Sequence, residues 1–435
     1  MTNQAKSHPA PQKQPIIHRA PWVVADTSAE IYTNTRDTIE DGAVVVSGGI
    51  IKAVGKFRDI SREFSSLPIQ EHESKVLAPA LINSHCHLEL SYLNLTESGG
   101  NQTSYSNDFT LWIRELLKAR DNFLQSTVDA EKQILSDGSQ VLREMAAEGV
   151  GFVGDIGNSL ASRTIGPDQN IEIFFLLELL GLTKKSEVLS LARLGEVFSD
   201  ESLEISCTAH APYSVTPALI QAIKDNADRR GHIFSIHVAE SKQEVEFLQT
   251  GTGRFLDFLH ERGAWDSTFK VPGMGAVHYL ESLGVLNDKT LCVHVVHVDH
   301  EEIGILALKK AKVCLCPGSN RFLGSGKAPV TEFLAHGILP SLGTDSKASN
   351  PVLSIWREMR LLREDHPGLL PETVFSMATR GGAEAWGIDS ALGTLEPGKQ
   401  ARILKVNCQS NMHSSKDILE YMTTAGESLQ VEWVE

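Results

Sequence analysis

The chain has 435 residues, of which 41% are hydrophobic and 22% are charged, as is typical of a globular protein. Its net charge of −15 argues against a nucleic-acid-binding protein, because phosphate neutralisation needs clustered Lys and Arg. No apolar run reaches the roughly 18 residues of a membrane helix, and the polar N-terminus lacks the apolar core of a signal peptide. The six cysteines are scattered without a Cys-x-x-Cys pair, so we expect reduced thiols and a cytoplasmic protein.

Both ends of the chain predict β-structure. Short segments typical of strands, separated by turns, follow the polar N-terminus, and the same sequence pattern recurs after Leu392. The expected strands are segments 20–24, 42–47, 50–54, 402–406 and 429–434. We expect a disordered lead-in over residues 1–15, followed by a small composite β-domain in which residues 16–77 pair with residues 393–435.

The middle of the chain predicts an α/β fold. Short apolar runs alternate with long amphipathic stretches, which is typical of βαβ units around a parallel sheet. The runs expected to be strands are 76–82, 150–155, 171–180, 203–209, 232–238, 290–296, 312–316 and 339–342. The stretches expected to be helices are 108–121, 127–148, 216–229, 241–259 and 352–364. Eight strands with intervening helices over roughly 300 residues predict a (β/α)8 TIM barrel, here over residues 78–392.

Two histidines one residue apart close the first of these strands, in the sequence Leu-Ile-Asn-Ser-His-Cys-His at 81–87. Side chains at i and i+2 of a strand lie on the same face. His85 and His87 can therefore point both imidazoles at one metal ion. A His-x-His pair alone is a weak signal, so its meaning depends on what the other strand ends carry.

Ligand-type side chains also end three later strands of the expected barrel. The fifth ends at His237, the sixth at His294 and His297, and the eighth at Asp345. Each has a structural alternative, since a lone histidine is more often structural and Asp345 can be a helix N-cap. A metal site explains four of eight strand ends together, and imidazole and carboxylate suit Zn²⁺ or Fe²⁺. Glu240 and His294 are left over for other roles.

These segments together resemble the amidohydrolase superfamily, and within it the chlorohydrolase/cytosine-deaminase-like branch of aminohydrolases. The resemblance spans nearly the whole chain. Its motifs lie at 78–87, 210–214, 237–241, 316–320, 342–350 and 392–399. It implies a distorted (β/α)8 barrel and a composite β-sandwich domain formed by both termini, in agreement with the strand pattern.

The resemblance also implies roles for particular residues. The implied ligands of a single divalent metal, zinc or alternatively iron, are His85, His87, His237 and Asp345. Glu240 would be the proton shuttle, His294 the polarising histidine, and Asp345 also the acceptor of the water proton. Cys86 stands where the family commonly has Thr or Ala, and we expect it to pack away from the metal. The expected third and fourth strands lack the lysine that bridges two metals in some members, which favours one metal.

The implied reaction is hydrolytic deamination of an aminated heterocycle, with release of ammonia. The pattern is most similar to deaminases of adenine-type nucleosides such as S-adenosylhomocysteine, 5′-methylthioadenosine or aminodeoxyfutalosine, and segment 319–322 favours the last. Guanine, cytosine or triazine aminohydrolases and chlorohydrolases stay open as alternatives. The expected substrate-contacting residues are His210, Phe109, Trp112, Asn320 and Arg321. Phe109 and Trp112 fit a cover over an aromatic base and a place in the core equally well.

Other classes of protein fit less well. The small zinc deaminases need a Pro-Cys-x-x-Cys motif, which this chain lacks. Segment 324–327 resembles a P-loop but lacks its first glycine, since Arg321 stands there. A non-catalytic barrel scaffold predicts lost ligands, whereas all four are present. We expect a small heterocyclic substrate as partner, no nucleic acid or membrane, and, by resemblance, a homodimer.

Overall fold

The computed structural model describes residues 14–26, 38–93, 95, 108–166, 171–199, 205–407, 412 and 414–434. Residues 1–13 of the expected lead-in lie outside the described residues. Within this described part, no helix is both long enough and apolar enough to cross a membrane.

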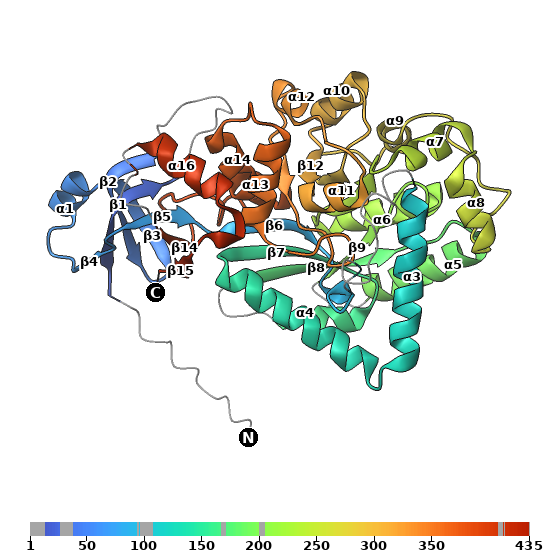
Figure 1. Ribbon diagram of the computed structural model, residues 1–435, viewed down its shortest axis with the longest axis horizontal. Helices are drawn as coiled ribbons and strands as arrows, with labels where there is room; N and C mark the ends of the chain where they lie inside the picture. The colour runs from blue at the N-terminus through green and yellow to red at the C-terminus, as the bar shows by residue number, and fades with distance from the viewer. Residues whose placement is uncertain are drawn as a thin grey trace.

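A seven-stranded sheet joins the two ends of the chain, with blue and dark red strands side by side in Figure 1. The strands are β1 Ile16–Val24, β2 Thr38–Ser47, β3 Ile50–Lys56, β4 Ile69–Glu71, β5 Lys75–Pro79, β14 Ile403–Asn407 and β15 Val431–Trp433. Their order is β15-β14-β5-β1-β2-β3, with β4 beside β1. The chain ends therefore share one sheet, while a second layer that makes it a sandwich stays a prediction.

Side chains alternate across this sheet, as strand geometry requires. Val44 belongs to one apolar cluster, together with Leu77 and Ile403. Its neighbours Ala43 and Val45 belong to a cluster on the opposite face, which helix α1 Phe57–Glu63 covers with Ile60. Both faces of the sheet are thus buried.

Eight parallel strands make up the larger part of the α/β fold, in two four-stranded sheets. One sheet contains β6 Leu81–Cys86, β7 Val150–Gly157, β8 Glu172–Leu179 and β9 Ser206–Ala209, in this order. The other contains β10 Phe234–Val238, β11 Thr290–His294, β12 Lys312–Leu315 and β13 Ser341–Leu342. Nearly all of their residues are buried, as expected for parallel strands covered on both faces.

Hydrogen bonds link the two parallel sheets at both edges. Ser235 of β10 donates its N–H to Oγ1 of Thr208 in β9 at 2.9 Å. At the other edge, the N–H groups of Thr344 and Asp345, which follow β13, donate to the carbonyl of His85 in β6, each at 3.0 Å. The carboxyl ends of the first and last strands are thereby held side by side.

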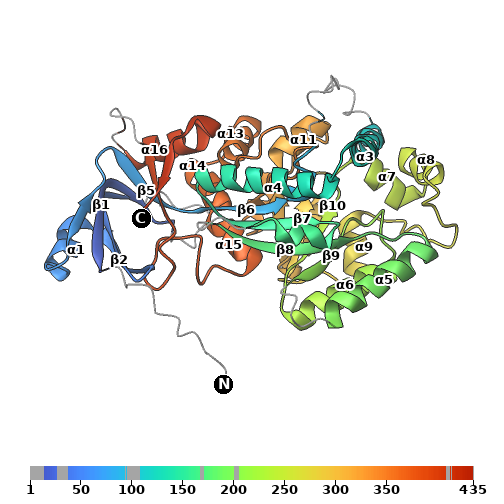
Figure 2. The same ribbon diagram turned by 90° about the horizontal axis from the view of Figure 1, so that it is seen from below.

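Helices cover the parallel strands on both sides, as Figure 2 shows for α4 on one side of β7 and α6 on the other side of β9. Before β11 lie α3 Phe109–Ser126, α4 Ala130–Ala147, α5 Lys184–Ser199, α6 Pro217–Arg230, α7 Lys242–Thr250, α8 Arg254–Glu261 and α9 Ala276–Ser282. After it lie α10 His300–Lys309, α11 Pro317–Leu323, α12 Val330–Ala335, α13 Ile355–Asp365, α14 Pro371–Ala378, α15 Arg380–Trp386 and α16 Ser415–Thr424. Short 3-10 turns are η1 Leu88–Leu90, η2 Leu160–Thr164 and η3 Gly426–Ser428.

Two expected elements are divided in the structure. The run 76–82 is split at Ala80, whose N–H bonds to the carbonyl of Arg402, whereas the N–H of Leu81 bonds to Gly149. The chain passes there from the terminal sheet to the parallel strands. The stretch 241–259 is two helices, α7 and α8, because Gly251 and Gly253 adopt φ values of +67° and +88°. Helix α16 occupies part of the C-terminal region that was expected to be β-structure.

Gly154 of β7 lies against Trp386 of α15, so a substitution at this glycine probes how α15 packs on the strands. A Cβ atom there would lie 1.9 Å from Cζ2 of Trp386, whose Nε1 donates to the carbonyl of Ser84 at 3.1 Å. We expect Gly154→Ala to lower the free energy of unfolding by about 1–3 kcal/mol, because overpacking forces the indole to move. Chemical denaturation measures this change.

A matched control is Gly195→Ala, on the exposed face of α5, where a Cβ meets nothing within 4 Å. This substitution should raise stability by up to about 1 kcal/mol, because alanine is the better helix former. Equal stability of Gly154→Ala and the wild type would contradict the packing described.

Candidate active site

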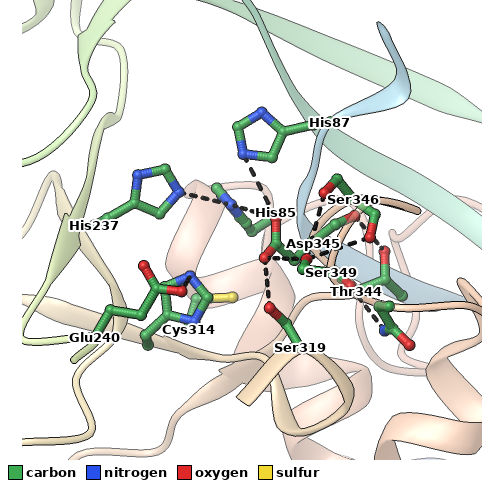
Figure 3. A network of polar contacts seen from close by, with 12 residues as sticks. His85, His87, His237, Glu240, Cys314, Ser319, Thr344, Asp345, Ser346 and Ser349 are labelled. Carbon is green, nitrogen blue, oxygen red and sulfur yellow. Dashed lines mark hydrogen bonds and ion pairs between the residues drawn. The ribbon is translucent and has the colours of Figure 1, made fainter. Parts of the chain in front are cut away.

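Three imidazoles and one carboxylate converge at the carboxyl ends of the parallel strands (Figure 3). His85 lies in β6 and His87 directly after it, His237 lies in β10, and Asp345 follows β13. Nε2 of His237 is 3.2 Å from Nε2 of His85. Oδ1 of Asp345 is 3.9 Å from Nε2 of His85 and 3.7 Å from Nε2 of His87. The fold thus brings together the four residues that the sequence singled out.

Left-handed backbone conformations direct several of these side chains. φ is +69° at His294, +46° at Val295 and +58° at Asp345. Such values are uncommon outside glycine, cost free energy, and cluster at active sites. Backbone hydrogen bonds hold the turns, since Val295 donates to the carbonyl of Val238 and Asp345 to that of His85, both at 3.0 Å. These backbone conformations lower the stability of the fold, and they direct the side chains of His294 and Asp345 into one cavity.

Two hydroxyl groups fix the carboxylate of Asp345. Ser319 donates to Oδ2 at 2.7 Å, and Ser349 donates to the same oxygen at 2.8 Å. Burial opposes ionisation of Asp345, but nearby imidazoles and the Ser319 hydrogen bond hold its pKa below the ordinary value. Oδ1 is therefore left to face the histidines as an ionised ligand atom.

The tautomer of His237 follows from its hydrogen bond. Its Nδ1 lies 2.8 Å from the carbonyl of His210, which accepts only, so Nδ1 carries the proton. The lone pair of Nε2 then points at the convergence point. Burial lowers the pKa of His237 to about 3, and burial likewise lowers the pKa of His85 far below its ordinary value. Both rings are neutral, as metal ligation requires.

Glu240 and His294 face each other beside this cluster. Oε1 of Glu240 is 3.6 Å from Nε2 of His294, and Nδ1 of His294 is 3.0 Å from Oδ1 of Asn320. Burial, followed by the charges of Asp345 and Glu244, raises the pKa of Glu240 well above its ordinary value. Glu244 accepts the N–H of Glu240 at 2.8 Å and so fixes the backbone that carries this side chain. A buried carboxyl group with a raised pKa can hold a proton at neutral pH.

A cavity of about 670 Å³ opens onto the cluster. His87, His237, Glu240, His294 and Asp345 form its inner end. Its wall also contains three of the five residues expected to contact substrate, namely Phe109, Trp112 and His210.

The two aromatic residues of the cavity wall are held differently. Phe109 is buried, and its ring also packs against Phe255 in the core, at a centroid distance of 6.1 Å. Trp112 donates its Nε1–H to the carbonyl of Ala348 at 3.0 Å. Phe109 therefore belongs to the core and the cavity wall at once, which the sequence left as alternatives.

The other two residues expected to contact substrate do not line this cavity. Asn320 instead lies with its Oδ1 3.0 Å from Nδ1 of His294. Arg321 turns away, and its guanidinium binds Glu364 at 2.6 Å and Asp365 at 3.0 Å. These carboxylates on α13 compensate its charge, so the expected substrate contact of Arg321 is corrected to a surface ion pair.

The cavity also contains residues that the sequence reasoning missed. Glu178 ends β8, and its Oε1 lies 3.9 Å from Nδ1 of His237. Its place at a strand end was the signal that could have found it. Arg120 and Arg193 lie in helices on the cavity wall, and among the described residues neither pairs with a carboxylate. Helical arginines carry no such positional signal.

The donor set fits a divalent ion by its own geometry. His85, His87 and Asp345 offer ligand atoms that all lie within 4.8 Å of one another, and so do His85, His237 and His294. Ligand atoms of a tetrahedral zinc ion are about 3.3 Å apart, given Zn–N bonds of about 2.0–2.1 Å. The 3.2 Å between Nε2 of His85 and Nε2 of His237 matches that spacing. The cluster therefore suits a metal better than it suits hydrogen bonding between neutral rings.

Comparison with known proteins agrees with this geometry. The model of the amidohydrolase family matches residues 76–431. The 5-methylthioadenosine/S-adenosylhomocysteine deaminase of Pelotomaculum thermopropionicum is 27% identical, over 91% of this chain and 87% of the relative. The aminodeoxyfutalosine deaminase of Deinococcus radiodurans is 28% identical, over 82% and 84%.

A solved structure shares the fold. The crystal structure of an adenosine deaminase from Xanthomonas campestris with bound zinc superimposes with a TM-score of 0.73, at 23% identity, over 97% of this chain and 91% of the other. The chain belongs to the amidohydrolase family, whose members are divalent-metal-dependent hydrolases.

His237→Ala should abolish metal binding, because it removes a ligand atom from a preformed, buried set. Purified wild-type protein should carry about one divalent ion per chain, and the variant close to none, by elemental analysis. His297→Gln is the control. His297 is another histidine at the carboxyl end of a parallel strand, since it follows β11, but its Nε2 lies 2.7 Å from the carbonyl of Ser325. Full metal content in His237→Ala would refute the ligand assignment.

Proposed function

We propose that this protein is a metal-dependent deaminase of an adenine-type nucleoside, which it hydrolyses with release of ammonia. The observation that carries the proposal is the placement of Glu240 and His294 beside the cluster of His85, His87, His237 and Asp345, within one cavity. The names of the two curated relatives support the substrate class.

His85, His87, His237 and Asp345 would hold one divalent ion, and zinc is proposed because neutral imidazoles and a carboxylate suit it. When bound, such an ion lowers the pKa of water toward 7 and so supplies a nucleophile at neutral pH. Zinc in the Xanthomonas campestris relative agrees with this choice. Elemental analysis of the purified protein distinguishes zinc from iron.

The protein's own residues move the protons. Asp345 accepts a proton from the attacking water, and His294 holds that water through Nε2. Glu240 donates its proton to the ring nitrogen next to the carbon that bears the amino group. The C–O bond forms, Glu240 takes the remaining proton of the attacking oxygen and passes it to the amino group, and the C–N bond breaks to release ammonia. Asp345 then returns its proton to Glu240, so both carboxyl groups regain their starting states. The raised pKa of Glu240 fits a group that begins the cycle protonated.

The cavity wall would orient the nucleoside. Trp112 and Phe109 offer aromatic surface to a purine ring, with the indole held by Ala348. His210 lies between Ser214, whose hydroxyl is 2.7 Å from its Nδ1, and the ring of His237. These contacts support a role for His210 in binding substrate on the metal side of the cavity.

Two arginines favour a nucleoside with a negatively charged 5′ substituent. Arg120 and Arg193 line the cavity without carboxylate partners among the described residues. An arginine fork matches a carboxylate, and charge-assisted hydrogen bonds are the stronger ones. S-adenosylhomocysteine and aminodeoxyfutalosine carry a carboxylate, whereas 5′-methylthioadenosine does not. Segment 319–322 no longer supports this preference, because Arg321 is paired elsewhere.

We also propose that the eight parallel strands close into a distorted (β/α)8 barrel over residues 78–392. Residues 16–77 and 393–435 would then form the composite β-sandwich domain. The hydrogen bonds at both edges of the two parallel sheets support closure. Five described cysteines, all unpaired and buried, support a reducing, cytoplasmic setting. A homodimer stays a prediction, which light scattering of the purified protein measures.

A screen for ammonia release tests the proposed reaction. Adenine-type nucleosides should release ammonia, and guanine, cytosine and triazines should not. Glu240→Gln should keep its metal but lose turnover by about 10²–10⁴-fold, because the amide cannot shuttle a proton. Glu246→Gln, on the exposed face of α7, is the control and should behave as wild type. Normal turnover by Glu240→Gln would exclude the shuttle role.

Arg120→Gln and Arg193→Gln test the preference for an anionic substituent. Each should lower kcat/KM for S-adenosylhomocysteine by about tenfold or more, since a charge-assisted hydrogen bond contributes about 1.5–3 kcal/mol. The kcat/KM for 5′-methylthioadenosine should stay within about twofold of wild type. An equal decrease in kcat/KM for both substrates would show that the arginines stabilise the cavity wall and do not bind the anionic substituent.

A further inference from the structure

A second cavity, of about 280 Å³, lies on the opposite side of the parallel strands from the metal-ligand cluster. It is bounded by the ends of α10 and α12, by the first residue of β12, by the segment before β13, and by α15. Because parallel strands run in one direction, these are their amino ends, whereas Asp345 and the histidines lie at the carboxyl ends. The two cavities share no lining residue.

The charged residues of this cavity are mainly cationic. Lys310, Lys312 and Arg380 line it, with His336 at its edge and Glu384 as its one acidic residue. The whole chain carries a net charge of −15, so a cavity with three permanent cations and one carboxylate is unusual for this protein. The local charge favours an anion.

Lys310 and Lys312 are free to bind a ligand. Among the described residues, neither forms an ion pair, whereas the adjacent Lys309 approaches Glu281 at 3.5 Å. Lys312 is half-buried, and Lys310 has a φ of +58° as the residue that ends α10. A half-buried ammonium group without a partner lacks compensation that an anion would supply.

Arg380 carries the strongest indication of a ligand. Its side chain is only 11% exposed, and its Nε is buried without a hydrogen-bond partner in the described structure. The nearest carboxylate oxygen, Oε1 of Glu384, lies 3.9 Å away, which is beyond hydrogen-bond distance. The Nε donor has almost no accessible surface, so a ligand in the cavity would be held by the terminal nitrogens of the guanidinium, whose planar fork matches the oxygens of a phosphate.

We propose that this cavity binds a phosphate group, as inorganic phosphate or a small phosphomonoester, at a site separate from the catalytic cavity. Arg380 supplies the planar fork, and Lys310 and Lys312 supply point charges to a dianion. The volume of about 280 Å³ is several times the roughly 30 Å³ that one water molecule occupies in the liquid, so a phosphate group fits. The ligand would tie α10, α12 and α15 together at the amino ends of β12 and β13.

Isothermal titration of the metal-loaded protein with inorganic phosphate, and separately with glycerol phosphate, tests this proposal at constant ionic strength. Wild-type protein should bind one equivalent, and Lys312→Gln and Arg380→Gln should each weaken binding by at least about tenfold. Lys309→Gln, the neighbouring lysine outside the cavity, should bind as wild type. At the same phosphate concentration, the Tm of wild-type protein should rise by more than that of Lys312→Gln.

A variant without the metal distinguishes binding in this cavity from binding of phosphate at the metal site. His237→Ala, which lacks a proposed metal ligand, should still bind phosphate with wild-type affinity. Lys312→Gln keeps the test decisive if Arg380→Gln folds poorly, because Lys312 is only half-buried. Absence of binding to wild type, unchanged affinity in Lys312→Gln, or loss of binding in His237→Ala would each overturn the proposal. Tighter binding of glycerol phosphate than of phosphate would identify a phosphomonoester as the ligand.

Discussion

The site depends on the junction between the first and last parallel strands. The N–H groups of Thr344 and Asp345 both donate to the carbonyl of His85, and Nδ2 of Asn83 donates to Oγ1 of Thr344 at 2.8 Å. This junction places a carboxylate from one end of the catalytic region beside histidines from the other. The left-handed conformation of Asp345 is tolerated because these bonds fix the backbone around it.

Burial then determines how the grouped side chains behave. In a low-dielectric site the charged form of an imidazole is disfavoured, so His85 and His237 stay neutral and keep their lone pairs. The same burial favours the protonated form of Glu240, whereas the nearby imidazoles, followed by the Ser319 hydrogen bond, hold the pKa of Asp345 below its ordinary value. Two carboxyl groups in one cavity thereby acquire the opposite protonation states that the proposed deamination uses.

The sequence predicted the parts of the fold and site that leave a local pattern. Short buried runs predicted the parallel strands, and strand-end residues predicted the cluster around His85, because a strand fixes where its last side chains point. Long-range packing leaves no such pattern. The division at Ala80, the orientation of Arg321 toward α13, and the two arginines on the cavity wall depend on partners far away in the chain. Helix α16 was missed although it carries a local signal, since the side chain of Ser414 caps it by accepting the N–H of Asp417.

Four side chains from three parallel strands, β6, β10 and β13, are proposed to form one metal site for hydrolytic deamination. The most direct measurement is an anomalous diffraction map of the crystallised protein, collected on either side of the zinc absorption edge. We expect one peak at about 2.0–2.2 Å from Nε2 of His85, His87 and His237 and from Oδ1 of Asp345. No peak in this cluster, or a zinc ion bound by other residues, would contradict it.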